Sequence, residues 1–258
     1  MAGKDAVVRH AIARCAGFVL LAGLCADDGF ALASQAGEDP YASRRRALVA
    51  EIRDDAVATV QATGDARLDS KVLDALQRVP RHAFVPASQR RHAYENRPLS
   101  IGYGQTISQP YIVALMTDLA RPRRGHKVLE VGTGSGYQAA VLAQLVDRVY
   151  SIEIIEPLGK QAAKRMQALG YDNIETRIGD GYYGWKEHAP YDAIVVTAAA
   201  SSVPPPLIRQ LKSGGRMVIP VGSSFFTQTL MLVEKDAKGR VRTRQILPVR
   251  FVPLTGEH

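Results

Sequence analysis

The sequence predicts an α/β protein whose central sheet is mostly parallel, ends in antiparallel strands and is preceded by helices. Two observations predict this class. From residue 127 onward, short runs rich in Val and Ile alternate with stretches of helical periodicity, which is the pattern of βαβ units. After residue 222 the helical stretches stop, and two β-rich runs flank the turn at 236–239, as in a β-hairpin.

Composition limits the possible classes of protein. The chain has 258 residues, of which 46% are hydrophobic and 22% are charged, so it can bury enough apolar surface to fold. It has no apolar run of about 18 residues, and we therefore expect no stable membrane insertion. The net charge is +8, but the arginines are not gathered with aromatic residues in one patch. We expect a solvated basic surface and no nucleic-acid partner.

Cysteine and histidine placement argues against thiol and metal chemistry. Both cysteines, Cys15 and Cys25, lie near the N-terminus, and the rest of the chain has none. The body of the protein therefore has no disulfide framework, cysteine nucleophile or thiolate zinc site. No two histidines have the i,i+4 spacing of helical metal ligands, so we predict no metal site.

Residues 1–33 differ from the rest. Three basic residues, Lys4, Arg9 and Arg14, precede an apolar run at 15–26, and the small-residue pattern Ala-Leu-Ala follows at 31–33. This arrangement is typical of a signal peptide. The alternative is an N-terminal extension without a targeting role.

Helical periodicity begins soon after the leader. Apolar residues at Leu48, Ile52, Val57 and Val60 predict a helix over 44–61, and a second helix over 69–78 is stopped by Pro80. We assign 34–67 as a helical extension and 68–254 as the main domain. The long loop-rich stretch at 79–110 holds several aromatic residues, which favours an ordered functional loop. A further helix is predicted over 111–119.

The alternating part of the chain supplies the sheet. Strands are predicted at 127–131, 148–154, 173–179, 191–197, 215–221, 229–235 and 241–249. Helices are predicted at 136–145, 156–169 and near 205–211. There is no internal repeat.

A glycine-rich turn follows the first of these strands. The sequence Gly-Thr-Gly-Ser-Gly at 132–136, hereafter the glycine loop, leads directly into a helix. Glycines let the backbone approach a ligand closely, and the helix N-terminus offers amide donors. Glu153 ends the next strand about twenty residues on, where it can bind ribose hydroxyls. The alternative is a tight turn followed by a surface glutamate.

The details of this region favour one cofactor. Position 137 is Tyr, where the dinucleotide fingerprint requires its third glycine. Glu130, just before the loop, suits a ligand that carries an ammonium and a sulfonium, and Asp180 with Gly181 follows the third strand, where an adenine amine can be read. This combination resembles the Rossmann-like S-adenosylmethionine-dependent methyltransferase fold.

Two nucleic-acid subclasses of that fold do not match. The fourth strand runs into Ala-Ala-Ala-Ser at 198–201, where base-amine methyltransferases carry an Asn/Asp-Pro-Pro-aromatic motif. Methylation of cytosine carbon requires a cysteine that the body lacks.

The remaining motifs resemble the protein-L-isoaspartate O-methyltransferase family, over about 68–254. The matching stretches are 79–86 (VPRHAFVP), 104–110 (GQTISQP), 128–137 (VLEVGTGSGY), 150–153, 156–158, 179–182, 184–185, 196–200, 220–222 and 251–254. The resemblance implies a protein repair enzyme that transfers a methyl group from S-adenosylmethionine to the α-carboxylate of L-isoaspartyl residues in damaged proteins and peptides. The alternative is a small-molecule or nucleic-acid methyltransferase on the same fold.

The resemblance also implies roles for individual residues. Ser108 is the active-site residue, although its side chain is alternatively a helix cap, and Thr106 and Gln109 are expected to orient the substrate. The expected cofactor-binding residues are Glu130, Gly132, Gly134, Glu153, Asp180 and Gly181. His82 is expected either to line the substrate groove or to pack within its loop, and for Asp180 a plain turn aspartate is the alternative.

The leader and the expected cofactor indicate different compartments for the protein. S-adenosylmethionine is made in the cytosol and does not cross a bilayer unaided, whereas the leader is typical of export. We expect a cytoplasmic monomer, with a periplasmic or exported enzyme, directed by 1–33, as the alternative.

Overall fold

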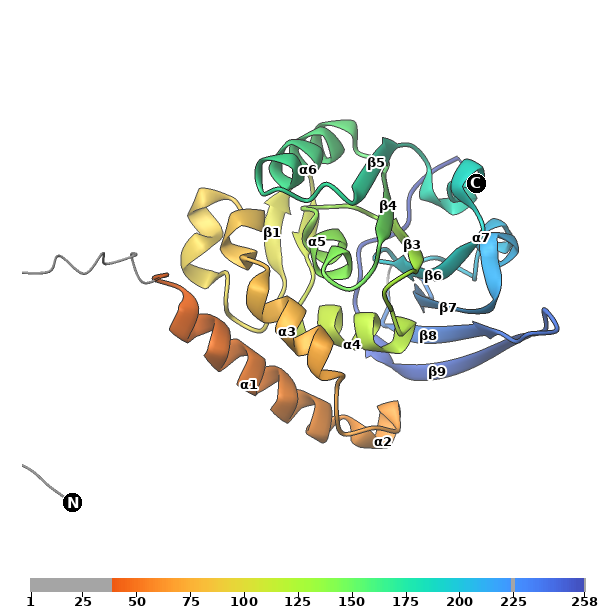
Figure 1. Ribbon diagram of the computed structural model, residues 1–258, viewed down its shortest axis with the longest axis horizontal. Coiled ribbons are helices and arrows are strands. Elements are labelled where there is room, and N and C mark those ends of the chain that lie inside the picture. Colours follow the sequence, from red (N-terminus) through yellow and green to blue (C-terminus); the bar gives the residue numbers. More distant parts are fainter. Residues whose placement is uncertain (1–38, 224–225, 258) are drawn as a thin grey trace, which may run out of the picture. The chain divides into compact units, whose positions relative to one another are not determined.

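The protein is described by a computed structural model, which covers residues 39–223 and 226–257. The predicted signal peptide at 1–33 lies outside these residues. The protein has a seven-stranded sheet, whose strands lie in the order β5-β4-β3-β6-β7-β8-β9 (Figure 1). Adjacent strands from β5 to β7 run parallel, and β8 and β9 are antiparallel to their neighbours. This arrangement confirms the predicted fold class.

The predicted strands and helices of the alternating region are all present. The strands are β3 (Lys127–Val131), β4 (Arg148–Glu153), β5 (Ile174–Ile178), β6 (Tyr191–Val196), β7 (Leu211–Val221), β8 (Gln228–Lys235) and β9 (Val241–Val249). The helices are α4 (Pro110–Ala120), α5 (Tyr137–Ala143), α6 (Glu156–Ala168) and α7 (Pro205–Gln210), and the short 3-10 turns are η3 (Gly181–Tyr183) and η4 (Lys186–His188).

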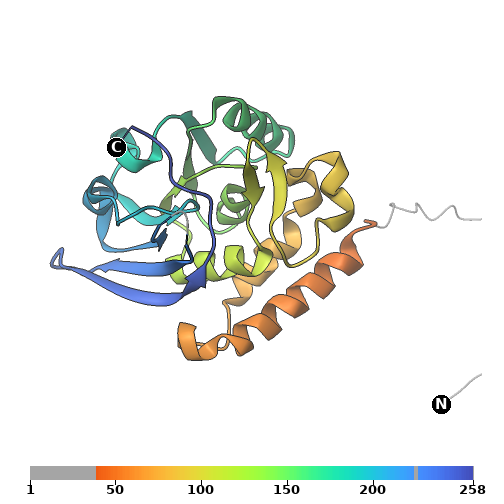
Figure 2. The ribbon, with the colours of Figure 1, turned by 180° about the vertical axis from the view of Figure 1, so that it is seen from behind.

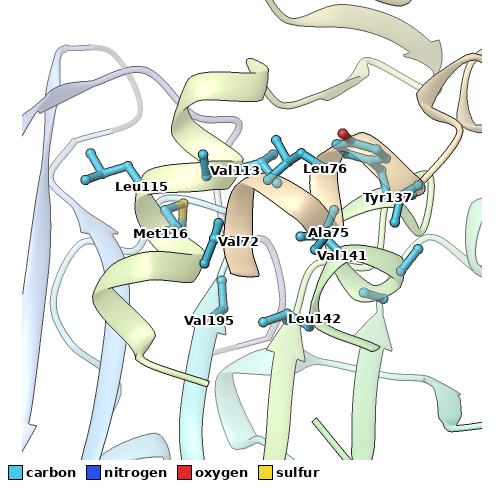
Figure 3. Close-up of a cluster of buried hydrophobic side chains, with 14 of the residues drawn as sticks. Val72, Ala75, Leu76, Val113, Leu115, Met116, Tyr137, Val141, Leu142 and Val195 are labelled. Carbon is cyan, nitrogen blue, oxygen red and sulfur yellow. The ribbon is translucent and has the colours of Figure 1, made fainter. Parts of the chain in front are cut away.

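The central strands β3, β4 and β6 are buried on both faces. Successive side chains point to opposite sides of the sheet, and each side is covered by a separate core. In β6, Val195 packs in the core under α4 and α5, while Ile194 and Val196 pack in a second core that includes Leu207 of α7. Figure 3 shows the first core, in which side chains of α3, α4 and α5 meet Val195. The molecule therefore has helices on either side of a central sheet.

The N-terminal helices extend the first core. They are α1 (Ala42–Ala58), α2 (Val60–Thr63) and α3 (Ser70–Arg78), and Figure 1 shows α1 alongside α3. The predicted single helix over 44–61 is interrupted at Thr59. Val57, predicted on the apolar face, is instead 59% exposed, because Ala56 lies one turn after the buried Ile52 and takes the buried position.

The stretch at 79–110 is ordered, as predicted, but it contains structure that its sequence did not reveal. Two 3-10 helices, η1 (Arg81–Phe84) and η2 (Ala87–His92), precede a hairpin of β1 (Leu99–Gly102) and β2 (Gln105–Ile107). Figure 2 shows this hairpin in yellow and the C-terminal segment in dark blue. No helix in the described part of the chain is long and apolar enough to cross a membrane.

Candidate active site

A cleft opens at the carboxyl ends of β3 and β6. Here the strand order reverses, since the chain runs outward from β3 to β5 and returns to the other side of β3 as β6; such switch points are the usual ligand sites of open parallel sheets. The cleft is lined by 105–108, 130–135, 152–155, 197–198 and 252–255, with Val113, Tyr137, Gln138 and Gly181. The structure thus brings together residues from six separate parts of the sequence.

The glycine loop fits closely against β6. Gly132 has φ of +97°, and a Cβ there would lie 2.5 Å from the hydroxyl oxygen of Thr197. That hydroxyl donates a hydrogen bond to the Gly132 carbonyl at 2.6 Å. Gly134 also has a positive φ, of +54°. Both glycines predicted to bind the cofactor therefore line the cleft in conformations that side-chain-bearing residues rarely adopt.

Glu153 lies at the end of β4, as predicted, and faces the glycine loop. Its Oε2 accepts a hydrogen bond from the Gly134 backbone N–H at 2.7 Å, and its Oε1 accepts one from the Ile155 N–H at 2.9 Å. Each carboxylate oxygen has two lone pairs, so acceptors remain for a pair of ligand hydroxyls.

Glu130 lies on the floor of the cleft and is completely buried. The Ser151 hydroxyl donates to its Oε2, and the Ser151 and Thr133 hydroxyls are 2.6 Å apart. Its Oε1 has no hydrogen-bond partner among the described residues. Burial raises the pKa of Glu130 to about 8, and a cationic ligand group would favour the ionised carboxylate.

The two residues after β5 have separate positions. Gly181 lines the cleft, and a Cβ there would overlap the side chain of Val131. Asp180 does not line the cleft but precedes Gly181 and caps η3, since its Oδ1 accepts a hydrogen bond from the Tyr182 N–H at 2.9 Å. This contact is the one expected of a plain turn aspartate. The role of Asp180 in adenine binding stays a prediction.

Thr106 lines the cleft from β2, and Ser108 lines it from the short segment between β2 and α4. Helix α4 begins with Gln109 as its N-cap and has no side-chain capping hydrogen bond, so the structure does not support Ser108 as a helix cap. Gln109 lines an adjoining cavity that shares Thr106, Ser108, Thr197 and Val252 with the first and is also lined by 248–251. Of the residues predicted to meet the substrate, Thr106 and Ser108 therefore lie at the junction of two cavities, and Gln109 lies in the second.

His82 lines neither of the two cavities. Its Nδ1 lies 2.7 Å from the Tyr94 hydroxyl, and its ring stacks on Tyr41 with centroids 3.9 Å apart. These contacts hold η1 against the start of α1, as expected of a packed histidine, and His82 as a substrate-binding residue stays a prediction. Burial lowers the pKa of His82.

Thr197, Ser151 and most of the C-terminal segment at 252–255 fall in stretches that match the family, but no site role was predicted for them from the sequence. Thr197 follows β6 directly and Ser151 lies near the end of β4; position at the carboxyl end of a parallel strand was the available signal. The C-terminal segment carried no such signal, because it reaches the cleft only through a bridge from Pro253 to Ala199.

The cleft fits S-adenosylmethionine by the chemistry of its lining. A buried acidic group in the lining suits an ammonium, the glycine backbone leaves room for close approach, and Glu153 offers acceptors for hydroxyls. No group of three or more metal-ligating side chains occurs within residues 39–223 and 226–257.

Comparisons with known proteins identify the family of this chain. Residues 53–258 match the family model for protein-L-isoaspartate(D-aspartate) O-methyltransferase (PCMT). A protein-L-isoaspartate O-methyltransferase 2 of Syntrophobacter fumaroxidans is 65% identical over 223 residues, covering 86% of this chain and 90% of that protein. A protein of the same name from Polaromonas sp. is 72% identical over 195 residues, covering 76% and 92%.

Solved structures show the same fold. A protein-L-isoaspartate O-methyltransferase structure superposes with a TM-score of 0.71 at 29% identity, covering 82% of this chain and 66% of that one. A Plasmodium falciparum structure described as a protein-L-isoaspartate O-methyltransferase in complex with S-adenosyl-L-homocysteine has a TM-score of 0.67 at 23% identity, covering 82% and 98%. The match over 53–258 and the two close relatives place this chain in the protein-L-isoaspartate O-methyltransferase family.

Proposed function

We propose that this enzyme transfers a methyl group from S-adenosylmethionine to the α-carboxylate of L-isoaspartyl residues in damaged proteins and peptides. The observation that carries the proposal is that Ser108 and Thr106 line the same cleft as Glu130, Glu153 and the glycine loop. A substrate bound at the 105–109 segment would therefore lie beside a cofactor bound at the glycine loop.

The cofactor site is assigned by charge and hydrogen bonding. Glu130 would hold the ammonium end, Gly132 and Gly134 the methionine part, Glu153 the ribose and Asp180 with Gly181 the adenine. When bound, S-adenosylmethionine supplies an electrophilic methyl group on a sulfonium. These residues bind and orient, and none of them has to move a proton.

The acceptor site suits a carboxylate nucleophile. A carboxyl group with an ordinary pKa near 4 is already ionised at neutral pH, so no general base is required. Among the described residues that line the first cleft there is no Lys or Arg, although Arg250 lines the adjoining cavity, and the Ser108 hydroxyl is a neutral donor. A neutral donor orients the carboxylate without the strong ground-state stabilisation of a cation, which would reduce its nucleophilicity.

Repair follows from the chemistry of the product. An isoaspartyl methyl ester carries a good leaving group next to a backbone amide, so it closes to a succinimide without further help. Hydrolysis of the succinimide returns part of the chain to normal aspartate. The enzyme needs only to hold one carboxylate oxygen in line with the methyl–sulfur bond.

A panel of acceptors tests the reaction class. The protein is incubated with methyl-labelled S-adenosylmethionine and, separately, with an isoaspartyl peptide, bulk RNA or a small dicarboxylic acid. Base-labile label on the peptide alone is the expected result. Label on RNA or on the small acid in place of the peptide would overturn the proposed substrate class.

We also propose a cytoplasmic monomer without a nucleic-acid partner. The cytosolic origin of the cofactor supports the location. The outer edge of the sheet supports the monomer, since residues 241–245 of β9 are exposed and include Arg242 and Arg244, and charged edge strands disfavour pairing between molecules. Gel filtration with light scattering tests the monomer, and a mass of two chains would contradict it.

A further inference from the structure

Arg81 is a buried charge that the proposed reaction does not use. It lies in η1 and is completely buried, which is rare for an arginine without an acidic partner. Within the described part of the chain Arg81 forms no ion pair, and its Nε and Nη1 have no hydrogen-bond partner. Burial lowers the pKa of Arg81 to about 10, which leaves it charged at neutral pH.

The guanidinium contacts both sides of the cleft. Nη2 donates a hydrogen bond to the Ser108 backbone carbonyl at 2.8 Å, and Cζ lies 4.9 Å from the centre of the Tyr137 ring. A longer contact of 3.4 Å reaches the Arg97 carbonyl. Tyr137 is the first residue of α5, directly after the glycine loop, and both Tyr137 and Ser108 line the cleft.

Stability alone does not account for this residue. A buried charge with incomplete partners is costly, and an apolar side chain of similar volume is often equally stable or more stable. Departures from ordinary packing of this kind are expected at functional sites. Arg81 contacts the segment that carries Ser108 and the start of α5 at Tyr137. These two segments must keep a fixed relative position for methyl transfer.

We propose that Arg81 is a positioning residue, whose guanidinium holds the Ser108 backbone against Tyr137 and so fixes the Ser108 hydroxyl relative to the glycine loop. This inference rests on the proposed function, in which Ser108 orients the carboxylate. Displacement of a reacting group by about 1 Å can lower the rate about a hundredfold, so a single carbonyl contact can matter for turnover.

Arg165 provides a matched comparison. Its Nη1 donates a hydrogen bond to the Ser135 carbonyl at 2.9 Å, so it holds the glycine loop as Arg81 holds Ser108. We expect Arg81→Met to lower kcat on an isoaspartyl peptide by about ten- to a hundredfold and to leave the Kd for S-adenosylhomocysteine within about twofold. Arg165→Met should instead weaken S-adenosylhomocysteine binding. Equal effects of the two variants on both quantities would indicate general loss of structure and would overturn the proposal.

Two further variants separate positioning from folding. Arg81→Lys keeps the charge and a donor group at the end of the side chain. Its kcat should lie between those of Arg81→Met and the wild type, and it can be measured even if Arg81→Met folds poorly. In the Ser108→Ala background, Arg81→Lys should change kcat little, because residues that act as a unit are not additive. If the kcat losses of Ser108→Ala and Arg81→Lys multiply in the double variant, Arg81 does not act through Ser108. The same conclusion follows if folded Arg81→Lys has the kcat of the wild type.

Hydrogen exchange tests the inference without any substrate. Backbone amides in the 105–109 segment should exchange about tenfold faster in Arg81→Lys than in the wild type, with unchanged exchange in β8 and β9. Unchanged exchange in that segment would overturn the positioning role. If the exchange result holds while the wild type fails to methylate isoaspartyl peptide, the proposed function fails and the positioning of Ser108 by Arg81 stands.

Discussion

The carboxylate of Glu153 accepts a hydrogen bond from the Gly134 backbone N–H at 2.7 Å. This contact joins the end of β4 to the glycine loop, so that the residue expected to bind ribose also shapes the turn around the cofactor. A second bond from the Ile155 N–H, at 2.9 Å, fixes the carboxylate in place. Glu153 thus lies on the side of the cleft proposed for the cofactor, and Ser108 lies on the side proposed for the substrate.

Variants of these two residues should therefore separate turnover from cofactor binding. Ser108→Ala removes a donor that faces the substrate, and we expect a lower kcat with nearly unchanged affinity for S-adenosylhomocysteine. Glu153→Gln removes charge-assisted hydrogen bonds and should weaken that affinity by about 1.5–3 kcal/mol. Calorimetric titration and peptide kinetics measure the two effects.

An exposed serine provides the control for this pair. Ser202 lies outside both cavities that hold Ser108, and Ser202→Ala should match the wild type in kcat and in binding. The assigned roles would be reversed if Ser108→Ala lost cofactor affinity while Glu153→Gln kept it.

Glu130 should make folding stability depend on pH. Burial raises the pKa of Glu130 from 4.5 to about 8. Because its pKa is higher in the folded chain than in the unfolded chain, its contribution to the free energy of unfolding is full below about pH 4.5 and is lost as pH rises through about 8. The non-titrating variant Glu130→Gln should lose less stability across this range than the wild type.

Urea unfolding of the ligand-free protein at several pH values measures this difference. A parallel fall in the free energy of unfolding for the two proteins would show that Glu130 titrates near its ordinary pKa.

Close packing at the glycine loop should make Gly132 intolerant of a side chain. In Gly132→Ala the new Cβ would meet the Thr197 hydroxyl at 2.5 Å, in addition to the strain of a positive φ. Gly125 has a similar φ of +82° with open space around it. We expect Gly125→Ala to lose about 1–2 kcal/mol of stability and to keep cofactor affinity. Gly132→Ala should lose cofactor affinity at least tenfold, and equal affinity in the two variants would show that the loop adapts.

The sheet could be predicted from sequence because its signals are local. Strands such as 127–131 and 191–196 are mostly apolar, and helical periods separate them, so their type and order follow from pattern alone. The glycine loop and Glu153 could be placed for the same reason, since both are defined by the ends of strands.

The remaining features depend on contacts between distant segments. Strands β1 and β2 have only four and three residues, too few to show a clear alternation of apolar and polar side chains. The sequence could not show whether His82 packs in its loop or lines the groove, because its partners Tyr41 and Tyr94 lie 41 and 12 positions away. The buried contact of Arg81 with Ser108 likewise spans 27 positions.

The compartment is tested at the N-terminus of the native protein. We expect the protein in the cytoplasmic fraction, because its cofactor is made there. N-terminal sequencing of protein recovered from separated cell fractions decides the matter. A periplasmic species that begins at Ser34 would show that the leader is cleaved and would contradict the cytoplasmic proposal.

Methylation of two peptides that differ only in one linkage tests the central claim most directly. An isoaspartyl residue presents a free α-carboxylate and adds a methylene to the main chain, whereas its aspartyl twin presents a β-carboxylate on a shorter branch. Because in-line attack is sensitive to displacement of about 1 Å, we predict a base-labile methyl ester on the isoaspartyl peptide, at least a hundredfold faster than on its twin. Equal labelling of the two peptides would contradict the account.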